Sequence, residues 1–314
     1  MTYLRKKFGH ISSQMKLRNT TMQEVNKIIN SIKCKDSAGY DEISSRILKK
    51  SAPYIIPPLI FICNKILSTG ILPERLKFAE VKPLLKKGDP TNCSNYRPIS
   101  ILTSFSKVIE KIIYKRLYYY LIDNKILVKE QMGFQEKLST DTATYAFLNT
   151  VLSSLDSKNY SGGLFCDLEK TFDCVNHDIL LAKMKFCGVT GIAHNLIRSY
   201  LTNRYQRTKI NQSSSTWERV NHGVPHGSVL GPLLFLIYIN DFPLAINKLA
   251  STVLFADDTT IILSNMNPDA FMNSTILVMN EIIEWFQSNL LSLNFNETTF
   301  LQFITKKIGK LLFK

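Results

Sequence analysis

Apolar residues recur at helical spacing through most of the first half of the chain. Thr21-Met22-Gln23-Glu24 matches a capping box, and valine and isoleucine residues three and four positions apart follow it. A longer apolar stripe of the same kind, from Ser104 to Asp123, has lysine and arginine residues between its apolar positions. The pattern predicts helices over residues 21–33, before Pro53, from Pro57 to Leu67, over 104–123 and over 143–155, and one strand over 80–85.

The second half changes to short runs of apolar and β-branched residues separated by polar turns. Two such runs, Thr252–Phe255 and Thr259–Leu263, flank Ala256-Asp257-Asp258 and predict a β-hairpin with two carboxylates at its tip. Further strands are predicted over 163–166, 206–210, 216–220 and 299–304, and helices over 175–186, 193–201, 229–239 and 268–290. Helices followed by a mixture of helices and strands predict an α+β fold.

Composition agrees with a folded core and adds a strong excess of positive charge. Hydrophobic residues make up 45% of the 314 residues and charged residues 20%, which argues against wholesale disorder. Lysine and arginine number 39 against 25 acidic residues, so the formal charge is +14 and the pI is near 9.4. Such an excess favours a nucleic-acid partner over an anionic membrane surface or simple solubility.

The sequence offers no targeting or zinc-binding signal. The first residues lack the apolar run of a signal peptide, and the longest apolar stretch, Val229–Ile239, is shorter than the roughly 20 residues of a membrane span. The cysteines form no C-x-x-C pair. We therefore expect an intracellular protein, in the cytoplasm or nucleus, without a membrane partner.

Three acidic residues stand where a strand is predicted to end. Asp257 and Asp258 lie at the hairpin tip, and Asp167 follows the apolar run Leu164-Phe165-Cys166. Carboxylates at such positions need a positive partner, and three of them at neighbouring strand ends could bind two Mg²⁺ ions, with Mn²⁺ as a substitute. This arrangement suits nucleotidyl transfer, but it also suits nuclease and cyclase chemistry.

Short motifs in a fixed order distinguish among nucleotidyl transfer, nuclease and cyclase chemistry. In this order they resemble the reverse transcriptases of non-LTR (LINE-type) retrotransposons, transposable elements whose jockey-like branch is the most similar, and the resemblance extends from about residue 20 to 305. The motifs are residues 37–41, 86–90, 95–100, 133–134 with 139–140, 167–173, 176–178, 223–225 with 227–232, and 255–258.

The resemblance implies a right-hand polymerase fold and an RNA-directed DNA polymerase activity. Residues 1–150 would form an N-terminal extension and a mostly helical fingers region, and residues 151–314 a palm with an antiparallel sheet. The implied partners are an RNA template, a DNA primer and deoxynucleoside triphosphates. We expect the thumb to be truncated or absent and the endonuclease and cysteine-rich tail to be absent; the oligomeric state is left open.

The resemblance also implies roles for single residues. Asp167 and Asp257 would ligate both metal ions and Asp258 would complete the acidic cluster. Phe172 would form an aromatic wall beneath the nucleotide sugar, although a core phenylalanine is the alternative. Arg97 would bind the triphosphate through its forked guanidinium, assisted by Lys86 or Lys87, which surface charge alone would also explain.

A further group would form the loop under the template–nucleotide pair, for which a plain turn is the alternative. These residues are Gly223, Pro225, His226, Gly227 and Ser228.

Three residues depart from the family pattern. His226 stands where glutamine is usual, Gln135 where arginine is common, and Glu297 where a lysine would donate a proton to pyrophosphate. Two interpretations therefore compete: a working polymerase domain, and a catalytically impaired retrotransposon remnant that only binds nucleic acid. A palm-type nucleotide cyclase is a third possibility, without support from the motif around Arg97.

Overall fold

The computed structural model describes residues 13–246 and 249–304, which form two compact units. The carboxylate unit, named for the three predicted acids, contains residues 127–175 and 235–304 of the described chain. The hairpin unit, named for its β1–β2 hairpin, contains residues 13–126 and 176–234. The units interleave along the sequence, and the assignment of residues 1–150 to fingers and 151–314 to palm stays a prediction.

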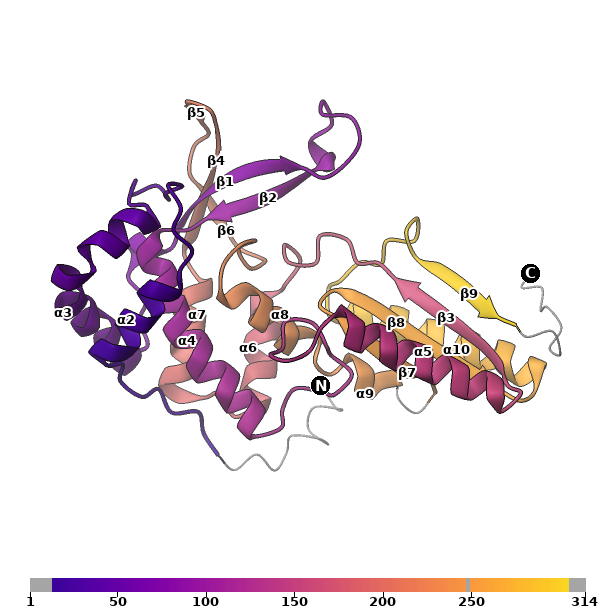
Figure 1. Cartoon of the computed structure of the whole chain (residues 1–314). Helices are drawn as coiled ribbons and strands as arrows, with labels where there is room; N and C mark the ends of the chain where they lie inside the picture. The colour runs from indigo at the N-terminus through magenta and orange to yellow at the C-terminus, as the bar shows by residue number, and fades with distance from the viewer. Residues whose placement is uncertain (1–12, 247–248, 305–314) are drawn as a thin grey trace. The chain divides into compact units, whose positions relative to one another are not determined.

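The carboxylate unit is built on a four-stranded antiparallel sheet with the order β7-β8-β3-β9. Its strands are β3 (Tyr160–Cys166), β7 (Ser251–Phe255), β8 (Asp258–Asn265) and β9 (Thr299–Phe303), and its helices are α5 (Thr140–Asp156), α9 (Phe242–Ile246) and α10 (Pro268–Ser288) (Figure 1).

Neighbouring strand residues bury their side chains on opposite faces of this sheet. Val253 and Ile262 pack against Ala143 and Val151 of α5. Gly163 pairs with Ile262, so its neighbour Gly162 faces the other way, and there the rings of Phe271 and Phe300 come so close that a Cβ atom would not fit. Helices α5 and α10 therefore cover opposite faces of the sheet and fix its position.

The hairpin unit combines helices with a second sheet of order β2-β1-β4-β5, in which β6 also pairs with β4. Its helices are α2 (Met22–Ser31), α3 (Ser45–Thr69), α4 (Ser104–Asp123), α6 (His177–Phe186) and α7 (Gly191–Leu201), with short 3₁₀ turns at Glu74–Leu76 and Cys93–Asn95. Its strands are β1 (Phe78–Leu85), β2 (Tyr96–Ile101), β4 (Arg204–Ile210), β5 (Ser213–Ser214) and β6 (Glu218–Val220). Helix α8 (Leu230–Ile239) carries residues of both units.

The predicted break near Pro53 and Pro57 is wrong, because α3 is one continuous helix. Its buried stripe, which includes Leu48, Ile56 and Cys63, continues at helical spacing past all three prolines. Pro53, Pro57 and Pro58 lie on the exposed side, so the carbonyl groups left without a backbone partner can bond to water. Packing of the opposite face therefore outweighs the proline signal.

Because α3 is one helix rather than two shorter ones, it reaches the length of a membrane-spanning helix. Among the described residues, α3 is the helix long and apolar enough to cross a membrane by length and composition, with 33% of its apolar window buried. A core helix of a soluble protein passes the same test, and α3 contacts α2, α4 and α7 within its unit. The absence of a membrane partner stays a prediction.

The sequence pattern predicts no strand over the residues of β2. Pro98 lies in the middle of this strand, and a proline cannot donate to a neighbouring strand. The strand forms nevertheless because β2 pairs on one side only, with β1, and is thus an edge strand. The helix over 104–123 and the hairpin around residues 256–257 are confirmed.

Candidate active site

The three predicted acids meet at one edge of the carboxylate-unit sheet. Cys166 at the end of β3 pairs with Thr259 of β8, and Phe255 of β7 pairs with Asp258. Asp167 is the next residue after Cys166, which places it at the level of Asp258. Asp257 lies in the two-residue loop between β7 and β8. The register of the sheet therefore gathers all three carboxylates at one end of adjacent strands.

The pKa of Asp258 supports the proximity of the three acidic residues. Partial burial of its carboxyl group raises the pKa of Asp258, and the negative charges of Asp257 and Asp167 raise it further. Residue Asp258 as a whole is exposed, so it is the carboxyl group rather than the entire side chain that loses water. Like charges held this close favour the binding of a cation between or beside them.

The donor set fits a divalent metal ion with open coordination positions. Within residues 13–246 and 249–304, no three histidine, cysteine or acidic side chains are already arranged closely enough to hold an ion by themselves. Carboxylate oxygens are the ligands that hard divalent cations prefer, and such ions commonly complete their shell with water and phosphate oxygens. The acidic edge therefore fits a metal site that the substrate would complete.

A buried glutamine that the sequence did not single out fixes the turn before Asp257. The side-chain amide of Gln131 donates to the Ala256 carbonyl at 3.2 Å, and its oxygen accepts from the Ala256 N–H at 2.9 Å and the Gly133 N–H at 2.8 Å. Gln131 is only 1% exposed. One side chain thus satisfies three backbone groups beside the acidic edge.

Ala256 needs this support because its backbone adopts a left-handed conformation, with φ 59°. That region is unfavourable for residues other than glycine by about 1 kcal/mol. Gly133 lies directly against it, and a Cβ atom on Gly133 would clash with the Ala256 backbone. The glycine of the predicted 133–134 motif therefore permits close packing against the turn that presents Asp257.

Phe172 lies in the carboxylate unit between two other aromatic rings. Its ring centroid is 6.4 Å from that of Phe134, at an edge-on angle, and 5.4 Å from that of Phe235 in α8. The side chain is half-buried, so one part packs and another remains accessible. Its role beneath a nucleotide sugar stays a prediction.

The predicted phosphate-binding cations lie together on the β1–β2 hairpin of the hairpin unit. Arg97 of β2 pairs with Leu84 of β1, and the Lys86 N–H bonds to the Asn95 carbonyl at 2.8 Å across the connecting turn. Arg97, Lys86 and Lys87 are all exposed. The exposed side chains of Arg97 and Lys86 can be reached by an anionic ligand from solvent.

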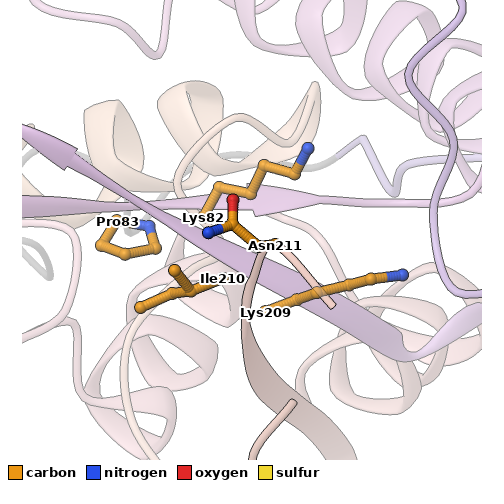
Figure 2. A pocket seen from close by; sticks show the side chains of 5 residues that line it. All are labelled: Lys82, Pro83, Lys209, Ile210 and Asn211. Carbon is orange, nitrogen blue, oxygen red and sulfur yellow. The ribbon is translucent and has the colours of Figure 1, made fainter. Parts of the chain in front are cut away.

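The same sheet has an open hollow of about 290 Å³ where β1 approaches the end of β4. Figure 2 shows the ammonium groups of Lys82 and Lys209 pointing away from Pro83 and Ile210. Lys209 lies 3.7 Å from the buried Glu80, which also pairs with Arg207. Part of the positive charge here is thus balanced by Glu80.

The loop predicted to lie under the template–nucleotide pair is a turn held by hydrogen bonds at several points. Gly223 and Gly227 have positive φ angles of 80° and 96°, which favour glycine. The Ser228 hydroxyl accepts from the Gly231 N–H at 2.9 Å, and the His226 carbonyl accepts from the Ser100 N–H at 2.8 Å. These bonds fix the shape of the loop, and its role under a template–nucleotide pair stays a prediction beside the alternative of a plain turn.

Two further side chains hold the ends of this loop. The His177 ring bonds to the Gly223 carbonyl at 2.8 Å. The buried Glu110 of α4 accepts from the N–H groups of Val229 and Leu230, at 2.6 and 3.2 Å. His177 belongs to the 176–178 motif of the sequence, whereas Glu110 belongs to none of the motifs; its sequence signal is an acidic residue inside the apolar stripe of residues 104–123.

The departures from the family pattern lie in different surroundings. Gln135 donates its amide to the Gln131 carbonyl, which gives this residue a local structural contact. Glu297 is exposed in a turn whose backbone bonds to Asn294. His226 is half-buried within the loop described above.

Comparison with known proteins agrees with this geometry. The model of the reverse transcriptase (RNA-dependent DNA polymerase) family matches residues 84–309, and the chain belongs to that family. Members of this family generally use divalent metal ions.

The relatives are encoded by mobile elements of the non-LTR type, as the motifs indicated. The probable RNA-directed DNA polymerase from transposon BS of Drosophila melanogaster is 30% identical over 81% of this chain and 29% of its own length. The RNA-directed DNA polymerase from mobile element jockey of the same species is 30% identical over 72% of this chain and 25% of its own length. The chain thus spans under a third of these relatives.

Proposed function

We propose that this chain catalyses RNA-directed DNA synthesis, adding deoxynucleotides to the 3′-hydroxyl of a DNA primer on an RNA template. The observation that carries the proposal is the acidic edge, where the sheet register brings Asp167, Asp257 and Asp258 together. Membership of the reverse transcriptase family supports this activity over nuclease or cyclase chemistry.

In this proposal the metal is Mg²⁺, bound as two ions by Asp167 and Asp257 with Asp258 beside them, and Mn²⁺ can replace it. The chemistry that such ions supply is activation of the attacking hydroxyl and neutralisation of the leaving pyrophosphate. The protein contributes the fixed position of the carboxylates, because Gln131 holds the hairpin turn and the sheet holds Asp167.

The remaining predicted residues act on the substrates. Arg97 binds triphosphate oxygens through its planar guanidinium, and Lys86 and Lys87 add positive charge on the same hairpin. Phe172 contacts the nucleotide sugar, and the loop from Gly223 to Ser228 contacts the template–nucleotide pair. The carboxylate unit corresponds to the palm of a right-hand polymerase, and the protein acts inside the cell, in the cytoplasm or nucleus.

Primer extension on an RNA template tests the proposal. Purified protein is given a DNA primer, Mg²⁺ and deoxynucleotides, next to Asp257→Asn and the control Asp156→Asn, which changes an exposed acid at the end of α5. We expect extension by the native protein and the control, and loss of extension in Asp257→Asn, because a neutral amide replaces a carboxylate that would bind the cations. Equal extension by Asp257→Asn would sink the metal assignment.

The same assay separates the impaired-remnant alternative. Absence of extension by the native protein, with salt-sensitive binding of the primer–template retained, would mark the chain as a nucleic-acid-binding remnant. In that case Glu297→Lys tests the cause, because a lysine at this position would supply the proton donor that the family pattern has there.

A further inference from the structure

A turn near the end of the described chain wraps around Asp167. The Asn294 N–H donates to the Asp167 carbonyl at 2.9 Å, and the Asp167 N–H donates to the Thr298 hydroxyl at 3.4 Å. The Glu169 N–H donates to the Ser292 carbonyl at 3.0 Å. The backbone on both sides of the Asp167 side chain is therefore tied to the segment from Ser292 to Thr298.

One contact in this turn involves the carboxylate itself. The side-chain amide of Asn294 donates to Oδ2 of Asp167 at 2.9 Å. A neutral donor at this point restricts rotation of the carboxyl group without adding a charge that would compete with a cation. Asn294 also closes its own turn, because its carbonyl accepts from the N–H groups of Glu297 and Thr298 at 3.1 and 2.9 Å. The asparagine is thus itself fixed in place.

We propose that Asn294 is a positioning residue, whose amide holds one oxygen of Asp167 so that the carboxylate is oriented for a divalent ion before substrate arrives. This inference rests on the proposed function and adds a residue to its site. The backbone bonds of Asn294 to Asp167, Glu297 and Thr298 do not involve its side chain, so a variant that removes only the amide leaves them available. The side-chain bond, in contrast, acts on the Asp167 carboxylate itself.

The test compares Asn294→Leu, which is similar in size but has no donor, with Asn296→Leu. Asn296 is exposed in the same turn, so its replacement controls for a general disturbance of the segment. Direct Mn²⁺ binding to the full chain is measured by electron paramagnetic resonance without nucleotide or template. Thermal unfolding and the dependence of primer extension on metal and nucleotide concentration are measured alongside.

We expect Asn294→Leu to bind Mn²⁺ about 10- to 100-fold more weakly, as for other residues that orient metal ligands. The metal concentration for half-maximal extension should rise in parallel, while the nucleotide KM and the behaviour of Asn296→Leu stay close to native. Mn²⁺ binding unchanged in Asn294→Leu, or equally weakened in Asn296→Leu, would overturn the inference.

Asn294→Ser keeps the comparison decisive if the leucine variant does not fold. Its hydroxyl is too short to replace the amide, so it should show the same loss of Mn²⁺ binding. Failure of the proposed function gives a different result, because the native protein would then extend no primer whatever the Asn294 variants do to Mn²⁺ binding.

Discussion

The acids of the carboxylate unit and the cations of the hairpin unit are held in opposite ways. Asp167 and the turn before Asp257 are tied by hydrogen bonds to Asn294 and to the buried Gln131. Arg97 and Lys86, in contrast, extend from a hairpin whose tip is exposed on most sides. Asp167 and the turn before Asp257 are thus fixed by the fold, whereas the hairpin that carries Arg97 and Lys86 is exposed to solvent.

The charges explain the difference. Neighbouring carboxylates repel one another, so they stay together only where packing and hydrogen bonds hold them. Cations that bind a triphosphate are attracted by the ligand itself and can become ordered when it arrives. The comparison teaches that the backbone carrying the acids is held by the fold of its own unit, while the hairpin that carries the basic residues is exposed to solvent. Under the proposed function, the acids would bind metal ions and the basic residues would bind phosphate.

The largest effect is expected from loosening the acidic edge. Gln131→Leu removes the partners of two N–H groups and one carbonyl beside Ala256, which should lower the free energy of unfolding by about 3 kcal/mol or more. Extension should fall with it, because Asp257 follows directly. Chemical denaturation measures the stability, with Gln287→Leu on the exposed side of α10 as the control. A loss below about 0.5 kcal/mol would show that the amide is dispensable.

Changing the exposed cations should affect binding and leave stability unaltered. Arg97→Ala is expected to raise the nucleotide KM about 10- to 100-fold, because a charged hydrogen bond contributes about 1.5–3 kcal/mol. The nucleotide KM of Arg97→Lys should lie between those of the native protein and Arg97→Ala, since lysine keeps the positive charge but lacks the planar, bidentate guanidinium group. Arg219→Ala, an exposed arginine on β6 of the same sheet, is the matched control. An unchanged KM in Arg97→Ala would remove this residue from the phosphate site.

The smallest effect is expected from Glu110→Gln, at the buried acid beneath the 223–231 loop. Burial raises the pKa of Glu110 above its ordinary value of 4.5, against the opposing effects of Arg204 and of the hydrogen bonds from Val229, Leu230 and Tyr200. The folded state therefore binds this proton more tightly than the unfolded chain. Its stabilising contribution is complete below pH 4.5 and is lost as the pH rises through the folded pKa.

Glu110→Gln, which keeps an acceptor without the charge, should thus become more stable relative to the native protein as the pH rises from 4 to 7. Unfolding midpoints across this range measure the difference. Glu110→Ala, which leaves two buried N–H groups unpaired, should be destabilised by about 2–4 kcal/mol at both ends of the range. If the native protein instead became more stable than Glu110→Gln as the pH rises towards 7, the Glu110 carboxylate would ionise in the folded protein without loss of stability. That result would contradict the prediction.

Elements with an unbroken pattern could be predicted from the sequence, and so could the positions of the acids. The apolar stripe from Ser104 to Asp123 gave the bounds of α4, and paired β-branched runs gave the hairpin that carries Asp257. Prolines misled the prediction in α3 and β2, because their cost depends on whether solvent or a neighbouring strand faces them. Whether a proline faces solvent or a neighbouring strand is decided by tertiary packing, which the sequence pattern does not show.

The residues that support the site were harder to find. Gln131 stands alone between Glu130 and Met132 and belongs to no periodic pattern, so its three bonds to the backbone become visible only when residues 131–133 lie beside β7. Asn294 lies three residues before Glu297, which the family pattern singles out, yet its contact with Asp167 joins residues 127 positions apart. A single sequence carries no direct signal for such contacts.

Hydrogen exchange of the free and substrate-bound protein tests the central claim that the acidic edge is assembled before substrate binds. Amides of residues 131–133 and 253–256 should exchange slowly in the free protein, and those of Gly88 and Asp89 at the exposed tip of the β1–β2 turn should exchange quickly. Adding a terminated primer on RNA with the next deoxynucleotide should protect the turn and leave the acidic edge nearly unchanged. Fast exchange at residues 253–256 that slows only with substrate would contradict the claim.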